Sequence, residues 1–395
     1  MFKHIVIVFT GLLSVANVYS QKTISEADAV SMAVKNSRNI SASGLAVLQQ
    51  KQLLKSSINL RNPDFFIESP TGKFYTGSIT QSIEFPTVYS KQYQLQKQRI
   101  VLAEKEKGFT ENEVKFQVKQ LYLLLRYVSA LQQQLYVQDT VYERISKAAG
   151  RQFDAGQIDY LQKTFAESQY GEIHNQYLQA QLTINNLQSQ LQYLTGLTYT
   201  FIAEPLNMTP LSDFAMTSDS TAFVTNPSLQ IFNQASVIAQ KNIALQKAKA
   251  LPGLAVGYFN QGERNSPIGN RFRIGLTVPL WFSQYKGNIN AAKTEWEINK
   301  QKISGLQQQL SVQLLQAKNE LAIYTQSLQY YKKSGIPKAN EIIGTAKRFF
   351  ESGENDYINF LRNINDAYSI QLKYLEVIRN YNQSLLSIKY LTGTL

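Results

Sequence analysis

The sequence predicts a mainly α-helical fold with a small antiparallel β part, in which one unit is used twice. Residues 151–196 recur without a gap as residues 348–393, at a constant offset of 197. Two further observations predict this fold class. Short segments alternate between polar and apolar residues as strands do, and segments of helical pattern without proline are longer than an ordinary globular domain can cover. Identical pairs, well above the roughly three expected by chance, include Arg151/Arg348, Phe153/Phe350, Gly156/Gly353, Asp159/Asp356, Tyr160/Tyr357, Ile173/Ile370, Tyr177/Tyr374, Leu194/Leu391, Thr195/Thr392 and Gly196/Gly393.

The first half is predicted to run helix, two strands, very long helix, turn, helix. Residues 23–60 have helical periodicity, whereas residues 74–85 alternate between polar and apolar side chains, and residues 63–69 are a weaker strand candidate. Residues 88–153 contain no proline, which predicts a helix of roughly 95–100 Å. After a short reversal, residues 158–194 form the returning helix, which stops at Gly196.

The second half repeats this order. We expect a helix over residues 227–250, strands over 254–261 and 271–280, and a long helix over 284–350 that is interrupted at residues 335–337. The last helix ends at Gly393. The repeat therefore predicts two long helical hairpins and four strands in each chain.

The division into domains follows from the repeat. We assign residues 21–200 to the first structural repeat, 201–225 to a connector and 226–395 to the second repeat, with the strands at about 63–85 and 252–281. Residues 1–20 have the features of a secretory signal peptide, because a short polar start precedes an apolar run and small residues near position 20. That run is too short to span a bilayer comfortably as an anchor.

The composition argues against an enzyme. The chain has no cysteine and two histidines, of which His4 lies in the signal segment, so no nucleophile–base triad and no histidine metal cage can be assembled. We assign no catalytic, cofactor-binding or metal-binding residue. The formal net charge is +12, but the basic residues are scattered along helices and the export signal disfavours a nucleic-acid partner.

The strands suggest assembly in a membrane. Segments of about 8–12 residues match strands that cross a bilayer in a tilted barrel, and four strands are too few to enclose a usable lumen. Several copies would therefore be needed. Aromatic residues where strands meet long helices could form a membrane-interface girdle or could pack as an ordinary core: Phe85, Tyr89, Trp281, Phe282 and Tyr285.

Four segments together resemble the TolC family of outer-membrane efflux proteins. They are residues 23–37, 248–252, 277–281 and 348–353, which are similar to the family's opening helix, its two helix–strand junctions and its hairpin turn. The resemblance implies a homotrimer in the outer membrane of a Gram-negative bacterium. Three chains would form a twelve-stranded β-barrel in the membrane and an α-barrel that extends through the periplasm, with no cofactor.

The repeated turns would form the periplasmic tip of such a channel, where family members hold the pore closed with charged and tyrosine side chains. The spacing after the glycine differs from well-known drug-efflux members, so individual gate pairs do not carry over. Asp159 and Asp356 could equally cap the returning helices. The candidates are Arg151, Asp154, Gly156, Asp159, Tyr160, Arg348, Gly353, Glu354, Asp356 and Tyr357.

The resemblance also implies partners and a substrate class. A family member would conduct substrates passively, together with a periplasmic adaptor (membrane fusion protein) and an inner-membrane pump of the resistance–nodulation–division (RND) type. The style of the motifs is similar to the heavy-metal efflux branch, the CusC- and CzcC-like proteins, which favours metal cations as substrate. Drug efflux and type I secretion stay open, as does a non-pore periplasmic coiled-coil or adaptor protein.

Overall fold

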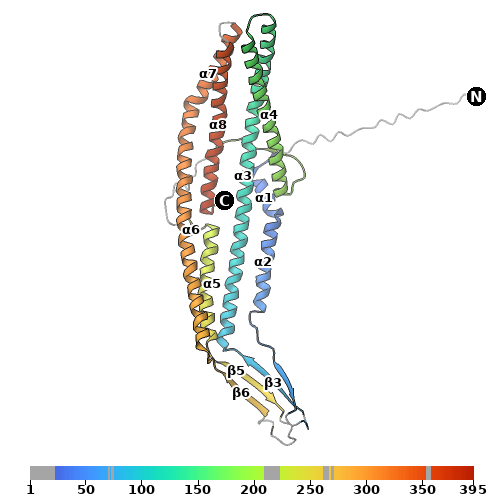
Figure 1. The fold of residues 1–395 in the computed structure, drawn as a ribbon, viewed down its shortest axis with the longest axis vertical. Helices are drawn as coiled ribbons and strands as arrows, with labels where there is room; N and C mark the ends of the chain where they lie inside the picture. Colours follow the sequence, from blue (N-terminus) through green and yellow to red (C-terminus); the bar gives the residue numbers. More distant parts are fainter. Residues whose placement is uncertain are drawn as a thin grey trace, which may run out of the picture.

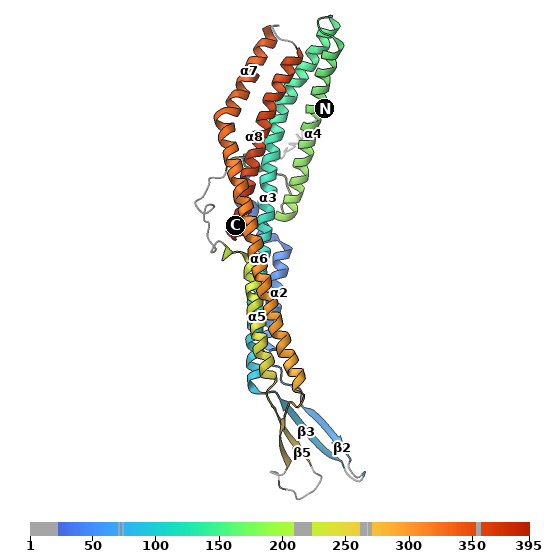
Figure 2. The ribbon, with the colours of Figure 1, turned by 60° about the vertical axis from the view of Figure 1, so that its left-hand side comes forward.

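The chain forms an elongated rod of paired helices with a small β-sheet at one end (Figure 1). This computed structural model describes residues 23–69, 72, 75–208, 223–260, 267, 271–352 and 357–395, although not the side chains of 349–352 and 357. The expected signal segment therefore lies outside the described residues. Figure 2 shows the rod from a second direction, with β2, β3 and β5 below the ends of α5 and α6.

The first half contains both a long helix and shorter helices that cover it. Its elements are β1 (Thr23–Ile24), α1 (Glu26–Asn36), α2 (Arg38–Lys55), β2 (Asp64–Glu68), β3 (Thr76–Ile83), α3 (Pro86–Asp154), α4 (Tyr160–Thr195) and β4 (Ile202–Ala203). The 69 residues of α3 confirm the very long predicted helix. Helix α4 packs beside the far part of α3, and α2 packs beside its sheet-proximal part (Figure 1).

The second half repeats this plan. It consists of α5 (Pro227–Lys249), β5 (Gly253–Phe259), β6 (Phe272–Thr277), α6 (Phe282–Tyr330), the π-helical turn η4 (Tyr331–Gly335), α7 (Ile336–Ser352) and α8 (Tyr357–Thr392). Helices α4 and α8 both contain 36 residues, as the repeat requires. The mainly helical fold with a small antiparallel sheet is therefore confirmed.

Two predicted details are corrected. The single helix over residues 23–60 is wrong, because Ser37 ends α1 and also caps α2 by accepting a hydrogen bond from the Ile40 amide. In addition, Thr23–Ile24 forms a short parallel pair with Ile202–Ala203 from the expected connector. The Tyr122 hydroxyl fixes this pair, since it donates to the Ile24 carbonyl (2.6 Å) and accepts from the Glu204 amide (2.9 Å).

The predicted interruption near Pro337 is a π turn within a continuing helix. Proline has no amide hydrogen to donate to the preceding turn. The Ile336 amide donates to the Tyr331 carbonyl, five residues back, so the wider turn accommodates the defect. Helices α6 and α7 therefore continue as one long element with a local irregularity.

Shorter helices meet end to end at two joints midway along the rod. At the first joint, the Asn36 side chain donates to the Thr195 carbonyl at the end of α4 (2.6 Å). At the second, the Asn226 side chain donates to the Leu391 carbonyl near the end of α8 (2.9 Å) and also caps α5. As a result, α4 and α2 continue one another along α3, and α8 and α5 do so along α6 and α7 (Figure 1).

Four of the described strands form an antiparallel sheet in the order β2-β3-β5-β6. Paired residues lie on the same face, so the register defines two faces. One face is mainly apolar and carries Phe65, Ile67, Ile79, Ile83, Leu254, Val256, Tyr258, Phe272, Ile274 and Leu276. The opposite face carries mainly polar and small residues, including Asp64, Glu68, Thr76, Ser78, Thr80, Ser82, Gly253, Ala255, Gly257, Arg273, Gly275 and Thr277.

Candidate functional site

The first hairpin turn lies at the end of the rod opposite the sheet. Helix α3 ends at Asp154, and Gly156 adopts a φ of 71°, which favours glycine. Two backbone hydrogen bonds close the turn, from Gly156 to Phe153 (2.9 Å) and from Gln157 to Gln152 (2.8 Å). The turn is therefore a defined structure that fixes where α4 begins.

Asp159 caps α4, as the capping interpretation predicted. Its carboxylate accepts a hydrogen bond from the Gln162 amide (2.7 Å), and the Gln162 side chain accepts one from the Asp159 amide (3.1 Å). This reciprocal pair is a capping box, which satisfies two amide groups that the first helical turn would otherwise leave free. The carboxylate is also exposed, so its charge faces the surroundings of the turn.

The other predicted residues of this turn are exposed rather than paired in a compact cluster. Arg151 and Asp154 are exposed, and Tyr160 is 69% exposed although its ring contacts Phe153 at a centroid distance of 6.0 Å. Lys163 places its amine 4.9 Å from the centre of the Phe153 ring. The turn thus presents charged and aromatic side chains outward.

The second hairpin turn is described only in part. Arg348 is exposed, and its guanidinium donates to Thr345 Oγ1 within α7 (3.3 Å). Gly353, Glu354 and Asp356 lie outside the described residues, and the side chain of Tyr357 does too. Their expected roles stay predictions that rest on the repeat.

Below the turns, a buried tyrosine pair joins the two hairpins. Tyr142 of α3 and Tyr368 of α8 approach to a ring-centroid distance of 6.2 Å, and Tyr142 is fully buried. Burial raises the pKa of each hydroxyl, and for Tyr142 the neighbouring Tyr368 and Asp366 add to this effect. Among the described residues, the Tyr142 hydroxyl has no hydrogen-bond partner, so its burial costs free energy.

Polar contacts next to this pair were not anticipated from the sequence. The Gln134 side chain of α3 donates to the Gln371 side chain of α8, which donates in turn to Asn340 of α7 (2.8 Å). Gln138, one helical turn from both Gln134 and Tyr142, is almost fully buried. Residues four positions apart lie on one face of a helix. The spacing of Gln134, Gln138 and Tyr142 could therefore have indicated from the sequence that this face of α3 meets another polar surface.

The sheet-to-helix junction is the second candidate region. Trp281 and Phe282 are exposed (77% and 69%), Phe85 is marginally exposed, and Tyr89 and Tyr285 are half-buried. The Tyr89 hydroxyl accepts a hydrogen bond from the Glu84 amide (2.9 Å), which fixes its ring at the start of α3. In the single chain, Trp281 and Phe282 therefore do not pack as a core; their position at a membrane interface stays a prediction.

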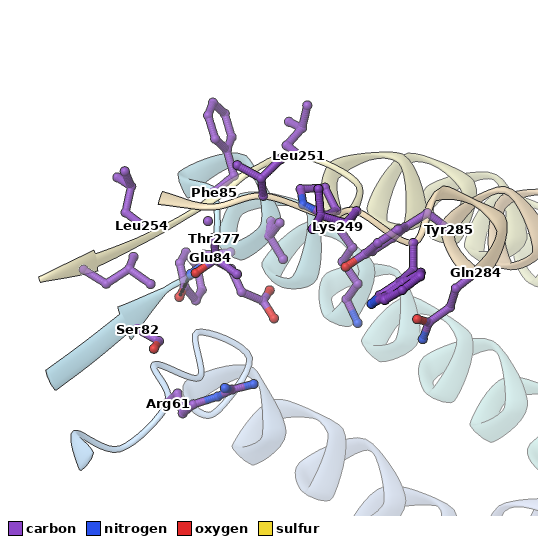
Figure 3. Close-up of a pocket in the computed structure, with 18 of the residues that line it drawn as sticks. Arg61, Ser82, Glu84, Phe85, Lys249, Leu251, Leu254, Thr277, Gln284 and Tyr285 are labelled. Atoms are coloured by element: carbon purple, nitrogen blue, oxygen red, sulfur yellow. Dashed lines mark hydrogen bonds between the residues drawn. The ribbon is translucent and has the colours of Figure 1, made fainter. Parts of the chain in front are cut away.

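A pocket of about 420 Å³ lies at this junction. Figure 3 shows residues from several elements around it, including Arg61 after α2, Glu84 after β3 and Lys249 at the end of α5. Its aromatic lining consists of Phe85, Tyr89, Trp281 and Tyr285. The pocket thus combines aromatic rings with charges of both signs where the sheet meets the rod.

Two further searches over the described residues were negative. None of the described helices combines the length and apolar character needed to span a bilayer. Within the same residues, no group of three or more histidine, cysteine, aspartate or glutamate side chains could hold a metal ion.

Solved structures with the same architecture identify the fold. The outer-membrane channel CmeC of Campylobacter jejuni superposes with a TM-score of 0.76 at 16% identity, covering 93% of this chain and 85% of CmeC. CusC superposes with a TM-score of 0.73 at 14% identity, covering 93% and 92%. The chain has the TolC fold. The outer-membrane channel OprN also superposes on this TolC fold, with a TM-score of 0.79 at 11% identity, covering 94% of this chain and 90% of OprN.

The chain is also similar in sequence to a protein of known role. The cobalt-zinc-cadmium resistance protein CzcC of Cupriavidus metallidurans is 23% identical over 255 residues, which are 63% of this chain. The match spans 60% of the length of CzcC. No family model matches the chain.

Proposed function

We propose that three copies of this chain form an outer-membrane channel with a periplasmic helical tube. The channel would be the outer component of a tripartite efflux system, together with a periplasmic adaptor and an inner-membrane RND-type pump. Substrates would pass through it by diffusion, with energy supplied at the inner membrane. No step of this role requires catalysis by the chain itself.

The single observation that carries the proposal is the two-faced sheet at the end of a long helical rod. Its apolar face is open, with Ile67 81% and Ile274 83% exposed, while its other face is polar. Within the described residues, the outer edges of β2 and β6 have no neighbouring strand. A sheet of this kind would satisfy its free edges and cover its apolar face by closing with further copies in lipid.

Exposed apolar residues along the rod support association of copies. Large aliphatic side chains are exposed on helices of both halves, and exposed apolar surfaces commonly mark protein interfaces. They include Leu45, Leu48 and Leu53 on α2, Leu178 and Leu182 on α4, and Ile298, Val312, Leu315 and Ile323 on α6. We infer that neighbouring copies cover them in a homotrimer.

Heavy-metal cations are the proposed substrate class. The support is the sequence similarity to CzcC, a cobalt-zinc-cadmium resistance protein. The cations would be cargo carried through the lumen, so no resident metal site is required.

The assembly is tested with the full-length protein in outer-membrane fractions. We expect a trimer whose migration on gels changes on heating, and discrete single-channel conductance in planar bilayers. Recovery as a soluble periplasmic protein would instead support the non-pore coiled-coil or adaptor alternative.

The substrate class is tested with a deletion strain. We expect hypersensitivity to Zn, Co, Cd, Cu or Ag that a plasmid copy of the wild-type gene reverses. Sensitivity to drugs alone would support drug efflux, and loss of a secreted protein would support type I secretion.

A further inference from the structure

The register within the sheet shows how far its two edge strands are displaced from each other. One row of paired residues runs from Asp64 through Thr80 and Gly257 to Arg273. Asp64 is the first residue of β2 and lies at the end next to the helices. Arg273 is the second residue of β6, which begins at the end away from the helices. Opposite ends of the two edge strands therefore share a row.

This displacement predicts the register between copies. In a closed barrel, β2 of one copy must lie beside β6 of the next copy at the same height in the membrane. The helix-proximal end of β2 then lies beside the helix-proximal end of β6, which shifts β2 by about four residues from the row that Asp64 occupies within its own sheet. Glu68 then lies opposite Arg273, and Asp64 lies opposite Thr277. A shift of about four residues in each of three copies corresponds to a strand tilt of roughly 35°, which is within the range for barrels of this type.

The side chains fit this register on both faces. Phe65 meets Leu276 and Ile67 meets Ile274 on the apolar face, while Phe66 meets Gly275 on the polar face. Strands β2 and β6 run in opposite directions along the sheet, so their pairing continues the antiparallel order. Each large side chain therefore has an apolar or a small partner across the boundary.

The charges fit as well. Glu68 is exposed on β2, and Arg273 is exposed on β6 with its guanidinium 4.2 Å from the centre of the Phe259 ring. Among the described residues, neither side chain forms an ion pair within its own chain. Arg271, which directly precedes β6, donates to the Tyr258 hydroxyl (3.3 Å).

We propose that Glu68 of one copy pairs with Arg273 of the next copy across the boundary between β2 and β6. The pair would lie on the polar face and would help to select the register in which the sheets join. The proposal deepens the proposed function, since it requires the trimer. Its occupant is a second copy of this chain.

Cysteine cross-linking tests the register directly, because the natural chain contains no cysteine. Full-length Glu68→Cys/Arg273→Cys in outer membranes should form a covalent trimer on mild oxidation. The matched control is Asp64→Cys/Arg273→Cys, which joins the residues that share a row within one sheet. Because the two β2 positions are about 13 Å apart along the strand, the control should cross-link at least about tenfold less.

The outcomes separate this proposal from the proposed function. Preferential cross-linking of the control pair, or no cross-linking of either pair in a protein that still migrates as a trimer, would overturn the register but leave the channel intact. A wild-type protein that never forms a trimer would overturn both.

Charge reversal tests the ion pair. Glu68→Arg should lower the temperature at which the trimer dissociates, and adding Arg273→Glu should restore most of the loss. A double variant no more stable than the Glu68→Arg single variant would refute the pairing of these charges.

Discussion

At the scale of single residues, Asp159 combines a helix cap with an exposed negative charge at the hairpin turn. The two roles can be separated, because Asp159→Asn keeps an oxygen acceptor for the Gln162 amide, whereas Asp159→Ala removes it. We expect the alanine variant to lose about 1 kcal/mol of stability and the asparagine variant much less. Thermal unfolding would measure this difference, with exposed Asp154→Ala as the control.

The gating hypothesis predicts a different result for the same substitutions. Loss of the acidic charges at Asp159 and Asp356 should raise single-channel conductance in planar bilayers, whether the new residue is alanine or asparagine. Unchanged conductance of the double asparagine variant would leave helix capping as the only role of these charges.

Tyr142 provides a second prediction at this scale. Because its buried hydroxyl has no partner among the described residues, Tyr142→Phe should leave stability unchanged or raise it by up to about 1 kcal/mol. Tyr122→Phe is the matched control, since its hydroxyl makes two hydrogen bonds to β1 and to the residue after β4. That variant should lose about 1–3 kcal/mol in denaturant unfolding, and a loss at Tyr142 equal to the loss at Tyr122 would contradict the assignment.

At the residue scale, local interactions were predictable from the sequence and contacts between the two repeats were not. The cap at Asp159 was predictable because capping depends on residues three positions apart. Burial of Tyr142 was not, because Tyr368 covers it from a helix of the other repeat. The preserved Gly-x-x-Asp-Tyr spacing identified the turns, but it could not show which side chains would meet there.

At the scale of elements, the two glycines that end α4 and α8 explain why the repeat preserves them. Gly196 and Gly393 have φ values of 74° and 71°. A methyl group at Gly393 would lie 2.3 Å from the Thr225 carbonyl oxygen, whereas at Gly196 the nearest atom is the Asn36 side-chain nitrogen at 2.9 Å. Backbone cannot move aside as readily as a side chain.

We therefore expect Gly393→Ala to be more destabilising than Gly196→Ala, although both place alanine in the left-handed region. Each should cost at least about 1 kcal/mol, and the difference should appear as a lower melting temperature for Gly393→Ala. Equal melting temperatures of the two variants would argue against the backbone contact.

Element boundaries were predictable where proline or glycine marks them. Helix α3 follows from its lack of internal proline, and both returning helices end at glycine as expected. The boundary between α1 and α2 at Ser37 was missed because neither glycine nor proline marks it, and a single capping serine separates the two helices. The π turn shows that a proline within a long packed helix can widen one turn without ending the helix.

At the scale of the whole molecule, the two-faced sheet predicts opposite results for neighbouring substitutions in β3. Ile79 lies on the apolar face and Ser78 on the polar face. If the apolar face contacts lipid, Ile79→Arg should cost about 2–4 kcal/mol and reduce trimer recovery from outer membranes, whereas Ser78→Arg should assemble normally. Heat-modifiable migration would report assembly, and equal recovery of both variants would contradict the assignment of the faces.

The overall architecture was predictable because the repeat, the strand alternation and the helix lengths agree with one another. The stacking of α4 on α2 and of α8 on α5 was not, because it depends on side-chain-to-backbone hydrogen bonds between segments far apart in sequence. In the proposed channel, closure of the sheet would also depend on more than one chain.

These end-to-end joints have a mechanical consequence. Helix α3 and the α6–α7 element pass the joints without a break, whereas the helices beside them are divided at Asn36 and Asn226. Resistance to bending is therefore lowest at that level, because only half of the supporting helices are continuous there. In the proposed efflux assembly, we expect bending to concentrate at this level, so misalignment between two membranes would be absorbed away from the sheet and the distant turns.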